Sequence, residues 1–123
     1  MKITYIVEDF SENGGVERIV TEKANTLATE YGHEVSVVSV YADKRKELYH
    51  LDGSIKMVHL GVPFADKHHG KLIKLISRTN TLMTAARRLN KTIKNLQPDI
   101  IFFTTTLGAL LLPLCHTKAR KIY

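Results

Sequence analysis

Short apolar runs alternate with longer segments of helical periodicity along the 123 residues. Strands are predicted where β-branched and aromatic residues cluster, over residues 3–8, 34–41, 55–60, 100–103 and 120–123. Helices are predicted where apolar positions recur every three or four residues, over residues 16–31, 70–96 and 107–116. Gly32 marks the end of the first helix, and Pro98 stops the second, because the residue before a proline avoids the helical region.

Strands that are separated by helices favour right-handed crossovers and a mostly parallel sheet with helices on both faces. The wholly apolar run over residues 100–103 is typical of an interior strand, whereas residues 55–60 are more polar. We therefore predict an α/β fold, a Rossmann-like doubly wound domain over residues 1–123. Because the chain ends within its fifth strand signal, we expect it to be the amino-terminal portion of a longer protein.

Composition narrows the class of protein. With 44% hydrophobic residues and a single cysteine, Cys115, the chain is neither a disordered tail nor a disulfide-stapled mini-protein. The longest apolar stretch, residues 107–115, is far shorter than the roughly 20 residues of a transmembrane helix. No signal peptide precedes the first strand. We therefore expect a cytoplasmic location.

The net charge of +6 is concentrated in one segment. Residues 66–97 carry eight basic side chains and one acid, a local balance of +7, while the rest of the chain sums to −1. Such a segment attracts phosphates on lipid headgroups, nucleic acids or substrates, although it can equally be the solvated face of a helix. No aromatic residue lies between Asp66 and Gln97 to stack on bases, which argues against nucleic acid.

Ligands of an open parallel sheet bind beyond the carboxyl ends of the strands, where the strand order reverses. If the order is 3-2-1-4-5, the loop over residues 9–15 lies beside residues 104–106. Gly14 and Gly15 would let the backbone approach a ligand closely, and the following helix would direct its amide groups at an anion such as phosphate. Thr104 and Thr105 would add hydroxyl groups. The glycine pair is equally consistent with an ordinary turn between a strand and a helix.

The sequence lacks the motifs of dinucleotide-binding, phosphate-binding and metal sites. After Gly14 and Gly15 no third glycine follows at the dinucleotide-binding spacing, and no phosphate-binding loop with Lys-Ser or Lys-Thr occurs. The six histidines and one cysteine do not have the spacing of a metal site. We therefore expect neither a metal nor a cofactor.

Three segments together resemble glycosyltransferase family 4. They are the opening strand over residues 2–7 with the turn Asn13-Gly14-Gly15-Val16-Glu17-Arg18, the stretch Tyr31-Gly32-His33-Glu34-Val35, and Leu96-Gln97-Pro98-Asp99-Ile100-Ile101. The resemblance covers essentially the whole chain. It implies the amino-terminal half of a GT-B transferase, which receives the acceptor, with a carboxyl-terminal domain that holds the nucleotide-sugar and is absent from this chain.

The resemblance also implies transfer of a sugar from a nucleotide-sugar donor to a glycan or lipid-linked acceptor, with retention of configuration and without a metal. This chain alone would be inactive. Gly14 and Gly15 would face the donor phosphates or the acceptor. Arg18 belongs to the motif, although its helical position also suits a surface residue. Many members carry a histidine after the Pro-Asp strand, but Phe102 and Thr104 occupy those positions here, so no catalytic residue is assigned.

Two further hypotheses remain open. Some relatives dock on membranes through a cationic, amphipathic part of this domain, and Lys71, Lys74 and Arg78 could form such a patch unless their segment packs into the core. The alternative function is a receiver-like signalling or phosphate-binding module, because the first strand ends near Glu8 and Asp9. That module needs a third acid after the strand over residues 100–103, where threonine follows instead.

Overall fold

The computed structural model describes residues 1–7, 15–40, 51–61 and 71–123, with every side chain in these ranges except those of residues 15–17, 71–78 and 105–107. Five strands are present: β1 (Lys2–Val7), β2 (Glu34–Ser39), β3 (Lys56–His59), β4 (Ile100–Phe103) and β5 (Arg120–Ile122). The helices are α1 (Gly15–Thr29), α2 (Lys71–Leu96), α3 (Thr105–Leu111) and the 3₁₀ turn η1 (Leu112–Leu114).

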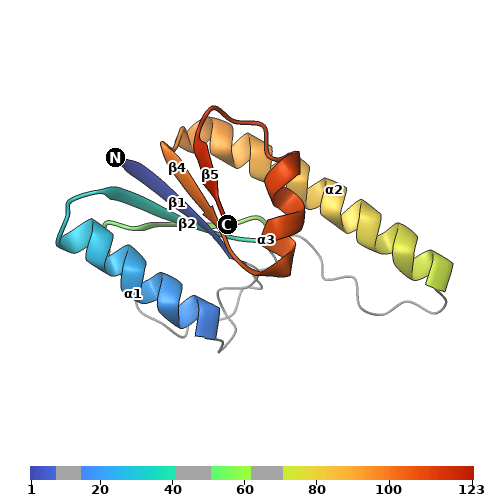
Figure 1. Ribbon diagram of the computed structural model, residues 1–123, viewed down its shortest axis with the longest axis horizontal. Helices are drawn as coiled ribbons and strands as arrows, with labels where there is room; N and C mark the ends of the chain where they lie inside the picture. Colours follow the sequence, from blue (N-terminus) through green and yellow to red (C-terminus); the bar gives the residue numbers. More distant parts are fainter. Residues whose placement is uncertain (8–14, 41–50, 62–70) are drawn as a thin grey trace.

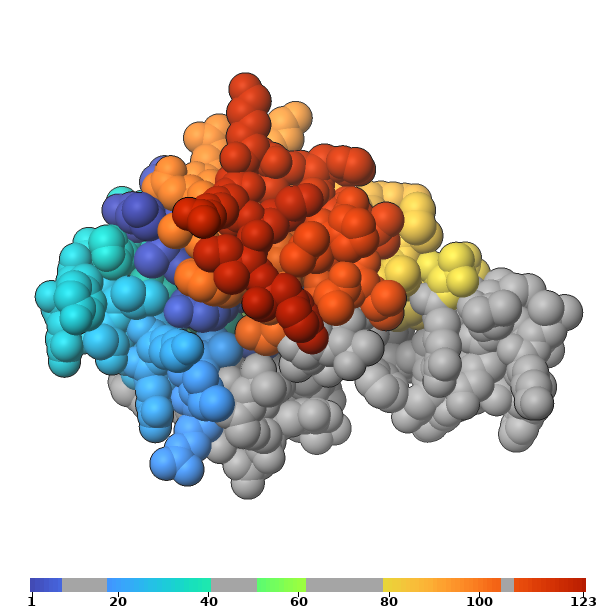
Figure 2. Space-filling view, in the orientation of Figure 1, coloured from blue at the N-terminus to red at the C-terminus, as the bar shows by residue number. Residues whose placement is uncertain are grey.

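The strands form one parallel sheet in the order β3-β2-β1-β4-β5, which is the order on which the expected site depended, and the parallel sheet confirms the predicted fold class. β1 occupies the centre and pairs with β2 on one side, Ile6 opposite Val38, and with β4 on the other, Ile6 opposite Phe103. In the space-filling view, the orange and red residues near the end of the chain lie against the dark blue residues of β1 (Figure 2).

Alternate residues of the strands supply two separate cores, as the two-residue period of a strand requires. Ile6 and Ile101 pack with Leu89 of α2 and Leu111 of α3 on one face. On the other face, Tyr5 packs with residues of α1 such as Ala24. Helix α1 therefore covers one face of the sheet, and α2 and α3 cover the other (Figure 1).

Helix α2 is much longer than the strands that it crosses. Its 26 residues span about 39 Å at 1.5 Å per residue. The buried residues among its described side chains, Ala85 to Ile93, lie in its carboxyl-terminal part. The amino-terminal part extends past the sheet (Figure 1). The helix ends at Leu96, and Gln97 follows with a φ of 48°.

The predicted helix over residues 107–116 is wrong at both ends. Helix α3 begins earlier, at Thr105, and ends at Leu111. Pro113 has no N–H to donate, so the chain tightens into η1 and becomes extended at Cys115. The Lys121 ammonium donates hydrogen bonds to the carbonyl oxygens of Leu112 (3.1 Å) and Cys115 (3.0 Å), which stabilises this ending.

Candidate functional site

The strand order reverses between β1 and β4, so the candidate site lies at the carboxyl edge of these two strands. Helix α3 starts directly after β4, and α1, which returns the chain from β1 to β2, starts at the same edge (Figure 1). Two helix amino termini therefore face one edge of the sheet, beside the only reversal in the strand order of the described residues.

Thr104 links the two central strands at this edge. Its backbone N–H donates to the Ile6 carbonyl oxygen at 3.2 Å, and its hydroxyl donates to the same oxygen at 2.7 Å. The residue has extended backbone angles, φ −119° and ψ 159°, and its hydroxyl does not cap α3. Since the hydroxyl hydrogen is directed at Ile6, Thr104 can offer a ligand acceptor electron pairs but no donor.

The glycine turn is described in part. Gly14 lies outside the described residues, and Gly15 is the first residue of α1. The first N–H groups of a helix have no partner within the helix, and its dipole places partial positive charge there. Thr105, the first residue of α3, has a described backbone but no described side chain.

Arg18 lies on the first turns of α1. Its Nε is 3.5 Å from the Glu22 carboxylate, and both side chains are about two-thirds exposed. An exposed pair at this helical spacing contributes little stability, on the order of 0.3–0.5 kcal/mol. The contact holds Arg18 along the helix surface, and its role toward a ligand stays a prediction.

Arg88 is a residue at this edge that sequence reasoning missed. Its guanidinium donates from one nitrogen to the carbonyl oxygens of Leu60 (2.7 Å) and Gly61 (3.0 Å), directly after β3. Gly61 has a φ of 64°, a conformation that glycine adopts without strain. The glycine was a visible turn signal, but nothing in the sequence paired it with an arginine on α2.

Gly108 brings α3 close to β4. A Cβ atom at this position would lie 3.2 Å from the Phe103 carbonyl carbon and 3.3 Å from the Phe103 Cβ. The short distances show that the helix rests directly on the last residue of the strand. This packing fixes the start of α3 beside Thr104.

Among the described residues, no acid directly follows β4, where the receiver hypothesis requires one. Asp52 lies before β3, at the amino edge, where its carboxylate accepts hydrogen bonds from the backbone N–H and hydroxyl of Ser54. Glu8 and Asp9 lie outside the described residues. Thr104, not an acid, follows β4.

Two features are absent from the described residues. No three His, Cys, Asp or Glu side chains in the described ranges are grouped so that they could hold a metal ion. Among the described helices, none has the length and apolar character that a membrane crossing requires.

Comparison with curated proteins gives no match. The model of Glycosyltransferase Family 4, however, matches residues 13–122, from two residues before α1 to the last residue of β5. The match includes every element that forms the carboxyl edge except β1. The chain therefore belongs to glycosyltransferase family 4, and its parallel sheet is the amino-terminal domain of the GT-B fold.

Proposed function

We propose that this chain is the acceptor-side domain of a transferase that moves a sugar from a nucleotide-sugar to a glycan or a lipid-linked acceptor, with retention of configuration. Membership of the family supports the general activity. The observation that carries the proposal is the carboxyl edge between β1 and β4, where Thr104 and the starts of α1 and α3 meet the reversal of strand order.

We propose a role for each candidate residue. Gly14 and Gly15 give the substrate access to the backbone, and the first N–H groups of α1 bind phosphate or acceptor oxygens. Thr104 accepts a hydrogen bond from a sugar hydroxyl, and Thr105 adds a second hydroxyl. Arg18 contributes positive charge near the same helix terminus. We assign no catalytic residue.

We further propose that a second, carboxyl-terminal domain holds most of the nucleotide-sugar and that the 123-residue chain alone is inactive. In a two-domain site, the donor phosphates bind across both domains, so one domain supplies only part of the binding energy. We propose a role in polysaccharide biosynthesis, as transfer of a sugar to a glycan implies. We also propose a cytoplasmic location, because the single cysteine suits a reducing compartment.

The test is a transfer assay with the complete gene product and with this chain alone, using UDP-sugars and GDP-sugars and detecting the released nucleoside diphosphate. The complete product should turn over at least one donor, and NMR of the product should show the anomeric configuration of the donor. Loss of the Thr104 hydroxyl in Thr104→Val should lower kcat/KM by roughly tenfold, whereas Thr104→Ser should keep most activity.

Two outcomes would contradict the proposal. Release of nucleoside diphosphate by the chain alone would show that no second domain is needed. Equal kcat/KM values for Thr104→Val and the unsubstituted protein, both folded, would show that the Thr104 hydroxyl does not bind the substrate.

We also propose contact with anionic membranes through Lys71, Lys74 and Arg78. Their backbones lie in the first turns of α2, the part that extends past the sheet (Figure 1). A cationic helix that is not covered by the sheet is available to lipid phosphates. The side chains of these three residues lie outside the described ones, so the proposal rests on their helical placement and charge.

Sedimentation with liposomes tests this contact. The protein should pellet with vesicles containing anionic lipid, less so at high salt, and Lys71→Gln/Lys74→Gln/Arg78→Gln should abolish binding. The matched control, Lys23→Gln/Arg87→Gln/Lys91→Gln, removes the same charge from exposed positions outside the patch. Equal loss in both triple variants would show that net charge alone causes the binding.

A further inference from the structure

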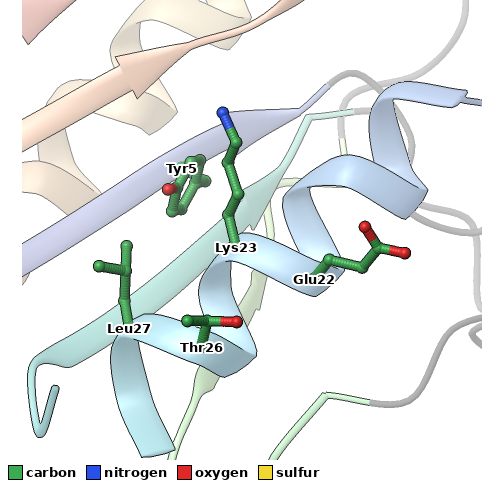
Figure 3. A pocket seen from close by; sticks show the side chains of 5 residues that line it. All are labelled: Tyr5, Glu22, Lys23, Thr26 and Leu27. Carbon is green, nitrogen blue, oxygen red and sulfur yellow. The ribbon is translucent and has the colours of Figure 1, made fainter. Parts of the chain in front are cut away.

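A shallow cavity, open to solvent, is lined by residues of α1 and β1 on the face of the sheet that α1 covers (Figure 3). Its volume is about 280 Å³, and its walls are formed by Tyr5, Glu22, Lys23, Thr26 and Leu27. Tyr5 lies in the middle of β1, and the other four residues lie in α1 from its central residue, Glu22, onward. The cavity is therefore separate from the carboxyl edge to which the transferase function is assigned.

Tyr5 is buried, and its hydroxyl has no partner among the residues that the structure describes. The side chain is only 5% exposed, and its ring stacks on Phe102 with 5.0 Å between the ring centroids. Within the described part of the chain, the hydroxyl forms no hydrogen bond. A buried donor without an acceptor is costly, and native proteins rarely leave one unsatisfied. A group from outside the chain that accepts a hydrogen bond would satisfy it.

Lys23 places a second donor beside Tyr5. Its side chain rises from α1 along the Tyr5 ring, and its ammonium has no carboxylate partner among the described residues (Figure 3). The Glu22 carboxylate instead pairs with Arg18 and points away from Tyr5. The positive charge of Lys23 is thus available to an anion at this cavity.

The remaining walls of the cavity are largely apolar. Leu27 lies one helical turn beyond Lys23 and is half-buried, and the Tyr5 ring and the methylene stem of Lys23 complete the apolar surface. The volume lies near the lower end of the range for small-molecule sites, which begins at roughly 300 Å³. This size suits a molecule of about ten non-hydrogen atoms rather than a whole helix or strand.

We propose that this cavity binds a small apolar carboxylate. The carboxylate accepts a hydrogen bond from the Tyr5 hydroxyl and pairs with the Lys23 ammonium, and the apolar body packs against the Tyr5 ring and Leu27. The Tyr5 phenol is a protonated donor at neutral pH, since its ordinary pKa is 10.0 and burial raises that pKa further. This site does not depend on the transferase function.

Titration of the ¹⁵N-labelled chain with phenylacetate tests the proposal. Saturable shifts of the Tyr5, Lys23 and Leu27 amide signals are expected, with a Kd on the order of 1 mM for a ligand of this size. Tyr5→Phe, which keeps the ring and removes the hydroxyl, should weaken binding roughly tenfold, as should the uncharged isostere phenylacetamide. Lys23→Gln should weaken binding and remove its dependence on salt.

The control is Tyr31→Phe, which removes the hydroxyl of a tyrosine that is 66% exposed and lies outside the cavity. It should leave the affinity unchanged. Absence of saturable shifts at about ten times the expected Kd, or equal affinity of Tyr5→Phe and the unsubstituted chain, would overturn the proposal. The cavity would then hold water alone as the partner of Tyr5.

Discussion

Asp99 joins three strands at the amino edge of the sheet. Its carboxylate accepts a hydrogen bond from the Lys2 backbone N–H at 2.8 Å, and its own N–H donates to the Lys2 carbonyl oxygen, also at 2.8 Å. Its carbonyl oxygen accepts from the Arg120 N–H at 3.0 Å. The Pro-Asp segment that helped to identify the family therefore has a structural role, at the opposite edge from the candidate site.

Replacing Asp99 should weaken the start of β1. Asp99→Ala removes the carboxylate bond and should lower the free energy of unfolding by about 1 kcal/mol, whereas Asp99→Asn keeps an acceptor oxygen and should cost less. Urea unfolding measures the difference. Glu30→Ala, an exposed acid near the end of α1, is the control and should have almost no effect. Equal costs for Asp99→Ala and Glu30→Ala would contradict the role given to the carboxylate.

Tyr5 and Cys115 make stability depend on alkaline pH. Burial raises the pKa of Tyr5 above its ordinary value of 10.0. Burial also raises the pKa of Cys115 above 9.0, although the nearby Lys121 charge opposes this shift. The folded state thus holds these protons longer than the unfolded state. The stability from both groups is complete below pH 9 and is lost as pH rises through their folded pKa values.

The free energy of unfolding, measured in urea between neutral pH and pH 11 under reducing conditions, should therefore fall at the alkaline end for the unsubstituted chain. Tyr5→Phe and Cys115→Val should each make that fall shallower, because each removes one of the two titrating groups. Tyr31→Phe, which removes the hydroxyl of a tyrosine that is 66% exposed, is the matched tyrosine substitution outside the two cores. Parallel curves for Tyr5→Phe and Tyr31→Phe would rule out a contribution from Tyr5.

At the scale of the element, the close packing of α3 on β4 depends on Gly108. A Cβ atom there already meets Phe103 at 3.2 Å, so the branched side chain of Gly108→Val must displace the helix or the strand. We expect a cost of about 1–3 kcal/mol, the usual range for overpacking. Ala109→Val is the control, since Ala109 is exposed on the same helix and the substitution adds the same branched side chain where no such contact exists. Helix propensity disfavours Ala109→Val but favours Gly108→Val, so propensity cannot explain a larger loss at Gly108. Thermal unfolding should show the larger loss for Gly108→Val, and a loss no greater than that of Ala109→Val would contradict the close packing.

The elements were predictable to different degrees, for physical reasons. The β-branched and aromatic runs located the strands, and the rules for parallel sheets predicted their parallel direction, but the strand order required the structure. The early end of α3 depends on Pro113 and on Lys121, which caps the turn from nine residues further along the chain. The periodicity of apolar residues in the sequence does not predict such a contact.

The same limit applies to the candidate site. The sequence predicted Thr104 at the carboxyl edge of the sheet. The direction of its hydroxyl, however, depends on the Ile6 carbonyl, 98 residues away in the chain. The position of Arg88 could not be predicted from the sequence, because its partners are two backbone carbonyl oxygens, and every residue has one. Side-chain bonds to backbone groups of another element therefore required the structure.

For the whole molecule, stability depends on two cores joined by one sheet. Leu89 of α2 is fully buried in the core that also contains Ile6, Ile101 and Leu111. Because α2 packs through the carboxyl-terminal part of its described residues, few other side chains can compensate for a cavity there. Loss of the Leu89 side chain should thus weaken the attachment of α2 to the entire sheet.

Leu89→Ala should lower the free energy of unfolding by about 2–5 kcal/mol, the range for truncating a buried leucine. A domain of this size has roughly 5–15 kcal/mol in total, so the variant should be partly unfolded at moderate urea concentrations that the unsubstituted chain withstands. Leu110→Ala is the matched control, because Leu110 is 51% exposed, and it should cost far less. If the two variants unfolded at the same urea concentration, α2 would not be held to the sheet through Leu89.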